Sequence, residues 1–407
     1  MSPVRHRYYQ PVPAQRGSNS LVLPYWRLSG FYFFYFALLG AYVPYWSLFL
    51  EGEGFSPLEI GYLSGAVMAT KIMAPNLWGW LADASGKRLR VVQLGALLAL
   101  LCFCGIFASR EFSTLLLVVL LYSFFWNAIL PQFEVITLAH LGAEYNRYSQ
   151  LRVWGSVGFI VAVVGLGAWF DRVSVASLPW VMAGLLATIW LSSLLIVDVA
   201  RPPRAANNAG LRQILRKKTV WGFLLVCFLL QVAHGPYYTF FSLHLEGLGY
   251  SRAAIGQLWA LGVVAEVVLF LFMHRVLPRF GIRLLTLACL ALAVLRWILI
   301  GYGAQYWLLL VLAQCLHAAT FGAFHAVAIE LIRRSFPPAL AGQGQALYSG
   351  LSFGAGGAVG AIASGWLWQY SQQATYLMAS GASLLALIIA WKYIHIEEAS
   401  DEVTPAS

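Results

Sequence analysis

The sequence predicts an all-α membrane protein whose helices form two similar halves related by a pseudo-two-fold axis. Two observations support this fold class: an extreme composition and an internal repeat. Of the 407 residues, 60% are hydrophobic and 10% are charged, whereas soluble domains carry about 25% charged residues. A globular core cannot hide this much apolar surface, so we expect lipid to surround most of the chain.

The repeat relates residues 40–63 to residues 235–258 at a constant offset of 195. Twelve of the 24 positions are identical, including the Leu-Glu-Gly sequence that starts at Leu50 and Leu245 and the glycines Gly54 and Gly249. Chance similarity between apolar segments does not explain glycine, serine and glutamate matching in register. Membrane transporters are often built from two such copies, with a site where the copies meet.

Twelve segments are apolar and long enough to cross a membrane, which takes about 20 residues. They are residues 25–50, 57–82, 91–109, 113–139, 152–171, 178–198, 219–245, 254–277, 284–302, 306–332, 345–369 and 374–395. Six belong to a predicted first half at 25–198 and six to a second half at 219–395. A polar linker at 199–218 joins them, with polar tails at 1–24 and 396–407.

Positive charges in the loops predict the orientation. One side carries 18 Lys and Arg residues, and the other carries only Arg110, Arg172 and Arg252. Because cytoplasmic loops are enriched in Lys and Arg, we expect both termini in the cytoplasm. The net charge of +10 is then a topology signal, and we predict no nucleic-acid partner. The first 24 residues lack the features of a cleavable signal.

The five cysteines all lie in apolar segments without the spacing of metal ligands, so we interpret them as packing residues and predict no metal site. They are Cys102, Cys104, Cys227, Cys289 and Cys315.

The loop between the second and third segments carries a specific motif. Residues 79–88 fit the pattern G-x-L-x-D-x-x-G-[RK]-[RK] at every position, through Gly79, Asp83, Gly86, Lys87 and Arg88. Gly79 permits close helix contact, Asp83 can accept hydrogen bonds from a neighbouring helix end, and Gly86 makes the turn. An ordinary basic loop is the plainer alternative, but a full match is more specific. The motif resembles the conformational signature loop of the major facilitator superfamily.

That resemblance implies the major facilitator fold, with two six-helix bundles and one central site that opens alternately to either side. In the second copy only Gly281 and Arg283 of the motif survive, and Pro278 replaces the aspartate. Within the superfamily the chain resembles the 3-phenylpropionate permease group of proton-linked uptake systems for aromatic acids. Residues 74–83, 151–159, 316–322 and 345–349 carry this resemblance.

A more distant similarity is to lactose permease. It implies that Glu134 and Arg152 contact substrate and that Glu266, Arg296 and His317 couple transport to protons. Three departures argue against a galactoside substrate. The acid expected three residues after the histidine is Thr320, the sugar-stacking tryptophan is Phe159, and residues 345–369 contain no charge.

Charges inside apolar segments are costly and usually mark function. Lys71 and Glu266 differ by 195, so they occupy equivalent positions in the repeat, and a pseudo-two-fold axis would place both near the interface of the halves. Lys71 lies twelve residues before Asp83, roughly 18 Å along a helix axis, too deep for easy snorkelling. We predict that Lys71 faces the cavity and attracts an anionic substrate.

The other charges in apolar segments leave alternatives open. Glu134 and Arg152 form either a cavity pair or a structural salt bridge, and Arg152 lies near enough to the boundary to be a headgroup anchor. Glu266, Arg296 and His317 are expected to form a network in which a carboxylate changes protonation as an arginine approaches. Glu330 is expected to pair with nearby arginines or to mark a proton exit. His234 and His325 are read as ordinary core histidines.

Aromatic residues fill the first segment, where positions 31–36 are all Phe or Tyr. Such a run covers every face of a helix, so some of the rings must face the cavity. There they could stack on an aromatic substrate, although packing is the default role. The predicted substrate-binding residues are Lys71, Glu134, Arg152, Phe159 and Tyr35.

Together these features predict a monomeric symporter in the bacterial inner membrane that imports a small organic anion, such as 3-phenylpropionate, with protons. The proton gradient drives it, and no cofactor is expected. A sugar or nucleoside symporter and a small-molecule exporter are the alternatives. A membrane sensor should carry a sizeable soluble segment, but the longest loop has about 20 residues. A membrane enzyme should show a nucleophile–base or metal cluster, and none is evident in the sequence.

Overall fold

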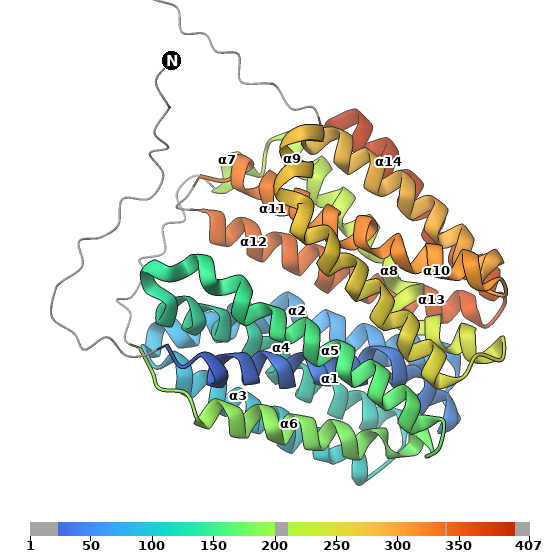
Figure 1. Cartoon of the computed structure of the whole chain (residues 1–407), viewed down its shortest axis with the longest axis horizontal. Helices are drawn as coiled ribbons and strands as arrows, with labels where there is room; N and C mark the ends of the chain where they lie inside the picture. The colour runs from blue at the N-terminus through green and yellow to red at the C-terminus, as the bar shows by residue number, and fades with distance from the viewer. Residues whose placement is uncertain (1–22, 200–210, 338–339, 395–407) are drawn as a thin grey trace, which may run out of the picture.

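The computed structural model describes residues 23–199, 211–337 and 340–394. The predicted tails and most of the predicted linker therefore lie outside the described residues, and the boundaries of the two halves stay a prediction. Helices α1 to α6 lie together as one group in Figure 1. The first group consists of α1 (Tyr25–Gly52), α2 (Pro57–Ser85), α3 (Arg88–Phe103), η1 (Cys104–Phe107), α4 (Phe112–Leu141), η2 (Gly142–Arg147), α5 (Tyr148–Phe170), η3 (Val175–Ser177) and α6 (Leu178–Leu194).

The second group contains the rest of the described chain and lies against the first along α2 and α5 (Figure 1). Two of its short elements, η4 and η5, are π-helical turns inside longer helices. The second group consists of α7 (Leu211–Ile214), α8 (Lys218–Gly247), α9 (Arg252–Gly303), α10 (Trp307–Cys315), η4 (Ala318–Ala323), α11 (Phe324–Ser335), α12 (Ala341–Ser349), η5 (Gly350–Gly356), α13 (Gly357–Trp368) and α14 (Gln372–Tyr393).

The sequence repeat has the same local structure in both copies. Helices α1 and α8 both end in a turn whose glycine has a left-handed backbone, with φ of 90° at Gly54 and 86° at Gly249. Ser56 and Ser251 then cap α2 and α9 by accepting a hydrogen bond from a backbone N–H in the first turn. Short-range contacts of this kind depend only on local sequence, which explains why the two copies agree.

Nine stretches of the described chain are long and apolar enough to cross a membrane. Two of them are far longer than one crossing needs: Phe112–Phe170 has 59 residues and Arg252–Gly303 has 52. The first is interrupted by η2, and the second bends at Gly281, whose φ is 70°. The predicted segment 57–82 coincides with α2, which is not one of the nine. The count of twelve stays a prediction.

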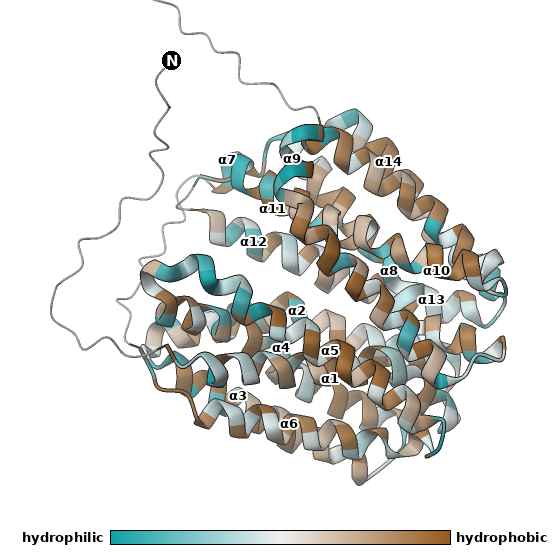
Figure 2. Cartoon of the chain, in the orientation of Figure 1, coloured by the Kyte–Doolittle hydropathy of each residue, from teal (hydrophilic) through white to brown (hydrophobic). Residues whose placement is uncertain are grey.

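Hydrophilic residues lie mostly towards the ends of the helices, and the middles of the helices are mostly hydrophobic (Figure 2).

The two groups of helices contact each other through glycines. A Cβ on Gly61 of α2 would lie 2.9 Å from the carbonyl oxygen of Ala361 in α13. A Cβ on Gly256 of α9 would lie 2.2 Å from the carbonyl oxygen of Val163 in α5. Residues without side chains let helix backbones approach this closely.

Candidate functional site

A cavity of about 220 Å³ lies between the two groups of helices. Helices α1 and α2 supply one wall, and α8, η4, η5 and α13 supply the other. It is therefore a central cavity shared by both groups, where a ligand would touch both. Its lining residues are Leu39, Tyr42, Val43, Ser64, Met68, Lys71, Gln231, Gly235, Tyr238, Thr239, Phe321, Phe353, Gly357 and Ala361.

Lys71 is the charged residue in the wall of this cavity. Its ammonium group forms no hydrogen bond or ion pair with any residue that the structure describes. A charge taken out of water without a partner is unfavourable, so an anionic group in the cavity would be attracted to it. The prediction that Lys71 faces a cavity between the halves agrees with this position.

Aromatic rings and small polar groups make up much of the remaining wall. Tyr42 comes from α1, Tyr238 from α8, Phe321 from the π-helical turn η4, and Phe353 from the π-helical turn η5. π-Helical turns occur often at functional sites, and both described turns of this type contribute a ring to the same cavity. A flat aromatic molecule would find faces to stack on here.

Four of the five predicted binding residues lie outside the lining of the cavity, namely Glu134, Arg152, Tyr35 and Phe159. Tyr35 is buried in the first group, where its hydroxyl donates to the carbonyl oxygen of Trp126 at 3.4 Å. Phe159 packs in a buried cluster with residues of α8 and α9, including Tyr237. Both rings therefore have packing roles in this conformation, and their contact with substrate stays a prediction.

Arg152 forms no ion pair with Glu134 or Glu266, although its charge acts on both. Its guanidinium lies over the ring of Phe36, 3.9 Å from the centroid. Glu134 accepts a hydrogen bond from Tyr148 at 3.2 Å. The direct Glu134–Arg152 salt bridge, one of the predicted alternatives, is therefore not formed in this conformation.

The predicted network in the second group is only partly assembled. Glu266 of α9 lies 3.6 Å from Nε2 of His317, and its side chain packs against Gly322 in η4, where an added Cβ would come within 2.8 Å. Arg296, the third member, forms no ion pair with Glu266. The structure thus joins the acid and the histidine and leaves the arginine apart.

Arg296 is fully buried, and its contacts are unusual for a charged group. The guanidinium lies between the rings of Tyr237 and Trp297, 4.3 and 4.7 Å from their centroids. It donates to the carbonyl oxygen of Ala313 and to the hydroxyl of Thr320, at 2.9 and 3.1 Å, while its Nη2 has no hydrogen-bond partner among the described residues. Thr320 is the position where the lactose permease resemblance implies an acid.

Glu330, His234 and His325 each have at least one polar partner, although Nε2 of His234 is buried without one among the described residues. Glu330 pairs with Arg333 at 2.6 Å and with Arg334 at 2.8 Å, as its surface-pair interpretation predicts. His234 bonds to the carbonyl oxygen of Leu230, and His325 contacts the hydroxyl of Tyr348.

The signature loop connects α2, α3 and α4 through side-chain contacts. Arg88 at the start of α3 forms an ion pair with Asp83 and also donates to Gln132 of α4. Gly79 allows this approach, because a Cβ there would lie 3.2 Å from the side-chain nitrogen of Gln132. Gly86 makes the turn with φ of 65°, as the motif predicts. Lys87 precedes α3 as its N-cap residue.

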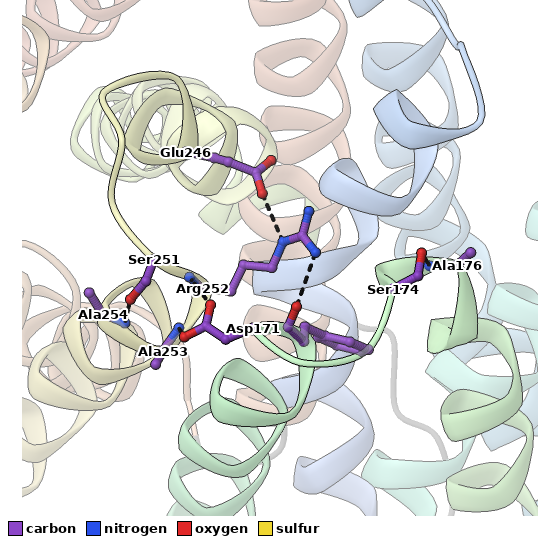
Figure 3. Close-up of polar contacts among 9 residues, drawn as sticks. Asp171, Ser174, Ala176, Glu246, Ser251, Arg252, Ala253 and Ala254 are labelled. Carbon is purple, nitrogen blue, oxygen red and sulfur yellow. Dashed lines mark hydrogen bonds and ion pairs between the residues drawn. The ribbon is translucent and has the colours of Figure 1, made fainter.

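At the end of the bundle opposite the signature loop, hydrogen bonds join the two groups of helices. Asp171, at the end of α5, accepts hydrogen bonds from the backbone N–H groups of Arg252 and Ala253, at 2.8 and 3.2 Å. Figure 3 shows the carboxylate beneath the first turn of α9. Arg252 in turn donates to the carbonyl oxygen of Phe170 and pairs with Glu246 at 2.7 Å. An acid from one group thus caps a helix of the other, where the helix dipole favours negative charge.

Replacing Asp171 by alanine is expected to weaken this contact between the two groups. We expect a cysteine placed at the cavity residue Thr239, in a variant without native cysteines, to react about fivefold faster with an impermeant thiol reagent added from the Asp171 side. The reason is that a helix cap contributes about 1 kcal/mol. Ser174→Ala is the control, because Ser174 caps only its own turn, at Ala176 (Figure 3). An equal rise in this control would contradict the assignment.

Sequence reasoning missed most of the neutral cavity wall. Gln231, Tyr238 and Thr239 project from one stretch of α8, and Ser64 and Met68 come from α2. Gln231 gave a usable signal, because an amide inside an apolar segment is rare. Nothing in the sequence indicated that Phe321 and Phe353 share one cavity.

Comparison with known proteins supports a transporter. A family model described as "MFS_1 like family" matches residues 25–378. A probable 3-phenylpropionic acid transporter from Escherichia coli (strain K12) is 30% identical, covering 89% of this chain and 96% of that protein. A maltose permease from Geobacillus stearothermophilus is 27% identical, covering 88% and 92%.

The crystal structure of the nucleoside transporter NupG (D323A mutant) has the same fold. It superimposes with a TM-score of 0.82 at 19% identity, covering 91% of this chain and all of that one. The chain is thus a multi-pass membrane transporter with the major facilitator fold and not an enzyme. With the family model spanning most of its length, the protein belongs to the MFS_1-like family of the major facilitator superfamily.

Proposed function

We propose that the protein is a proton-coupled symporter that imports a small aromatic carboxylate, such as 3-phenylpropionate, through the central cavity by alternating access. It acts as a monomer in the bacterial inner membrane, with both termini in the cytoplasm. The observation that carries the proposal is the unpaired ammonium of Lys71 in a cavity shared by both groups of helices. The carboxylate would bind Lys71, and the ring would lie among Tyr42, Tyr238, Phe321 and Phe353.

The name of the Escherichia coli relative gives independent support for this substrate class. A cation among aromatic side chains matches the two parts of an arylalkanoate, its charge and its flat ring.

Proton coupling is proposed for the charges around Arg152. Glu134 belongs to the first group of helices and Glu266 to the second, and Arg152 interacts with both without an ion pair. A small movement of one group would bring Arg152 nearer to one acid and farther from the other. Because an approaching cation favours the charged form of a carboxylate, such a movement would release a proton from one site.

Arg296 offers a second route for the same coupling. A buried guanidinium without an acid costs several kcal/mol, so a rearrangement that brought Glu266 to Arg296 would be favourable once Glu266 had lost its proton. Glu266 is already held next to the helix turn that bears Thr320, the present partner of Arg296.

The proposal is tested with purified protein in vesicles. Labelled 3-phenylpropionate should accumulate when the outside is more acidic than the inside, and counterflow should persist without a gradient. Absence of both would refute the substrate class. Accumulation that survives collapse of the pH gradient would refute proton coupling, and export under the same gradient would reverse the direction.

A sugar or nucleoside is the second candidate, favoured by the neutral side of the cavity. Gln231, Thr239 and Ser64 offer an amide and two hydroxyls, which suit a ligand rich in hydroxyl groups. Counterflow of labelled maltose or uridine in the same vesicles, with no counterflow of 3-phenylpropionate, would favour this candidate.

A further inference from the structure

A second hollow lies on the outside of the second group of helices. It is a groove of about 630 Å³ between the first turns of α8 and the last turns of α14, with Leu351 of η5 on its wall. Helices α8 and α14 touch at its base, where a Cβ on Gly222 would lie 2.6 Å from the Cβ of Tyr393. The groove is separate from the central cavity and shares no lining residue with it.

Apolar side chains in this groove are exposed. Trp221 is 54% exposed and Leu225 is 44% exposed, and both line the groove. In a membrane protein such side chains meet lipid, and tryptophan is enriched where the hydrocarbon region gives way to headgroups. The groove therefore lies at a depth that both the acyl chain and the headgroup of a phospholipid can reach.

Two cations line the same groove. Arg216 and Lys218 are exposed, and neither forms a hydrogen bond or ion pair within the part of the chain that the structure describes. Paired free cations next to an apolar channel match a molecule with an anionic head and a hydrocarbon tail. Basic pockets between membrane helices bind anionic lipid headgroups in this manner.

We propose that this groove is a binding site for an anionic phospholipid. The phosphate lies between Arg216 and Lys218, and an acyl chain runs along Trp221 and Leu225. The chain's own acidic C-terminus is a poorer occupant, because residues 395–407 (HIEEASDEVTPAS) contain no apolar run to fill the groove. The linker residues 200–210 are basic, so they do not complement the two cations.

A neighbouring groove on the same protein serves as an internal control for this proposal. It has a similar volume, about 580 Å³, and is lined by Arg283 and Arg334 beside Trp391 of α14. Its cations are engaged, because Arg334 pairs with Glu330 at 2.8 Å and Arg283 donates to the carbonyl oxygen of Trp391 at 3.5 Å. Because both of its arginines already have partners, this neighbouring groove should bind an anionic headgroup more weakly than the groove at Arg216 and Lys218.

The test measures binding of dioleoyl phosphatidylglycerol to the purified full chain by native mass spectrometry and thermal unfolding. We expect saturable stabilisation by this lipid and a much smaller effect of dioleoyl phosphatidylcholine. Arg216→Gln with Lys218→Gln should weaken phosphatidylglycerol binding roughly 25-fold, since each cation near an anionic lipid surface contributes about fivefold. The matched control is Arg212→Gln with Lys217→Gln, which removes two exposed cations of the same segment outside the groove.

Several outcomes would overturn the proposal. Equal stabilisation by phosphatidylcholine would show a non-specific lipid effect, and equal loss in the control pair would show a general charge effect. Stabilisation by glycerol phosphate alone would show a free phosphate site without a lipid chain. A stronger effect of Arg283→Gln with Arg334→Gln would move the site to the other groove, and increased lipid binding after removal of residues 395–407 would identify the tail as the occupant. None of these measurements depends on the transported substrate.

Discussion

Replacing Lys71 by glutamine is expected to lower kcat/KM for uptake of 3-phenylpropionate by roughly 10- to 100-fold. A hydrogen bond to a charged group contributes about 1.5–3 kcal/mol, and Lys71 is the charged residue that lines the central cavity. The loss should be specific to the acid, so the variant should no longer distinguish 3-phenylpropionate from its uncharged amide. Competition of both compounds against the labelled acid in vesicles measures this ratio.

Lys217→Gln is the matched control, because Lys217 is an exposed lysine at the start of α8. It should transport like the unmodified protein. An equal loss in both variants would point to a general charge effect. If the Lys71→Gln variant still distinguishes the acid from the amide, another residue binds the carboxylate. Arg152 would then be the next candidate.

Replacing Glu266 by glutamine is expected to abolish proton-driven accumulation while leaving exchange intact. Glutamine has the shape of glutamate but cannot bind and release a proton. With one proton per monovalent anion, a pH difference of one unit should drive about tenfold accumulation, and the variant should bring the internal and external concentrations only to equality. Accumulation and counterflow measured in the same vesicles separate the two properties.

Glu134→Gln carries the same test to the second candidate acid, and Glu144→Gln is the control. Glu144 is exposed and pairs with Arg147 at 2.5 Å, so its loss should not affect accumulation. If Glu134→Gln loses accumulation and Glu266→Gln keeps it, the proton site belongs to the first group of helices. If both keep it, the carboxylates around Arg152 do not carry the proton.

Local features of the fold were predictable because they depend on residues close together in the sequence. The matching turns at Gly54 and Gly249 and the caps at Ser56 and Ser251 follow from glycine's freedom at positive φ and from side chains that reach a backbone N–H three residues away. The same reasoning gave the turn at Gly86. Hydropathy likewise gave the membrane class, since composition does not depend on how helices are placed.

The candidate site was predictable only in part. Lys71 stood out because an isolated cation in an apolar segment has few structural reasons to be there. Tyr35 and Phe159 were chosen from an aromatic run and from a family resemblance, but neither lines the cavity. The face of a helix that meets the cavity depends on helix rotation, which an all-aromatic run such as residues 31–36 does not specify.

Composition, the repeat and the motif are enough to show a doubled, all-helical membrane protein with a signature loop at residues 79–88 and a deep cation at Lys71. The surroundings of Lys71 and Glu266, which are equivalent in the repeat, could not be read from the sequence: Lys71 lines a cavity and Glu266 lies against His317. The cap that Asp171 forms on a helix of the opposite group was equally hidden. These contacts join residues about 50 to 290 positions apart, so they depend on how whole helices pack.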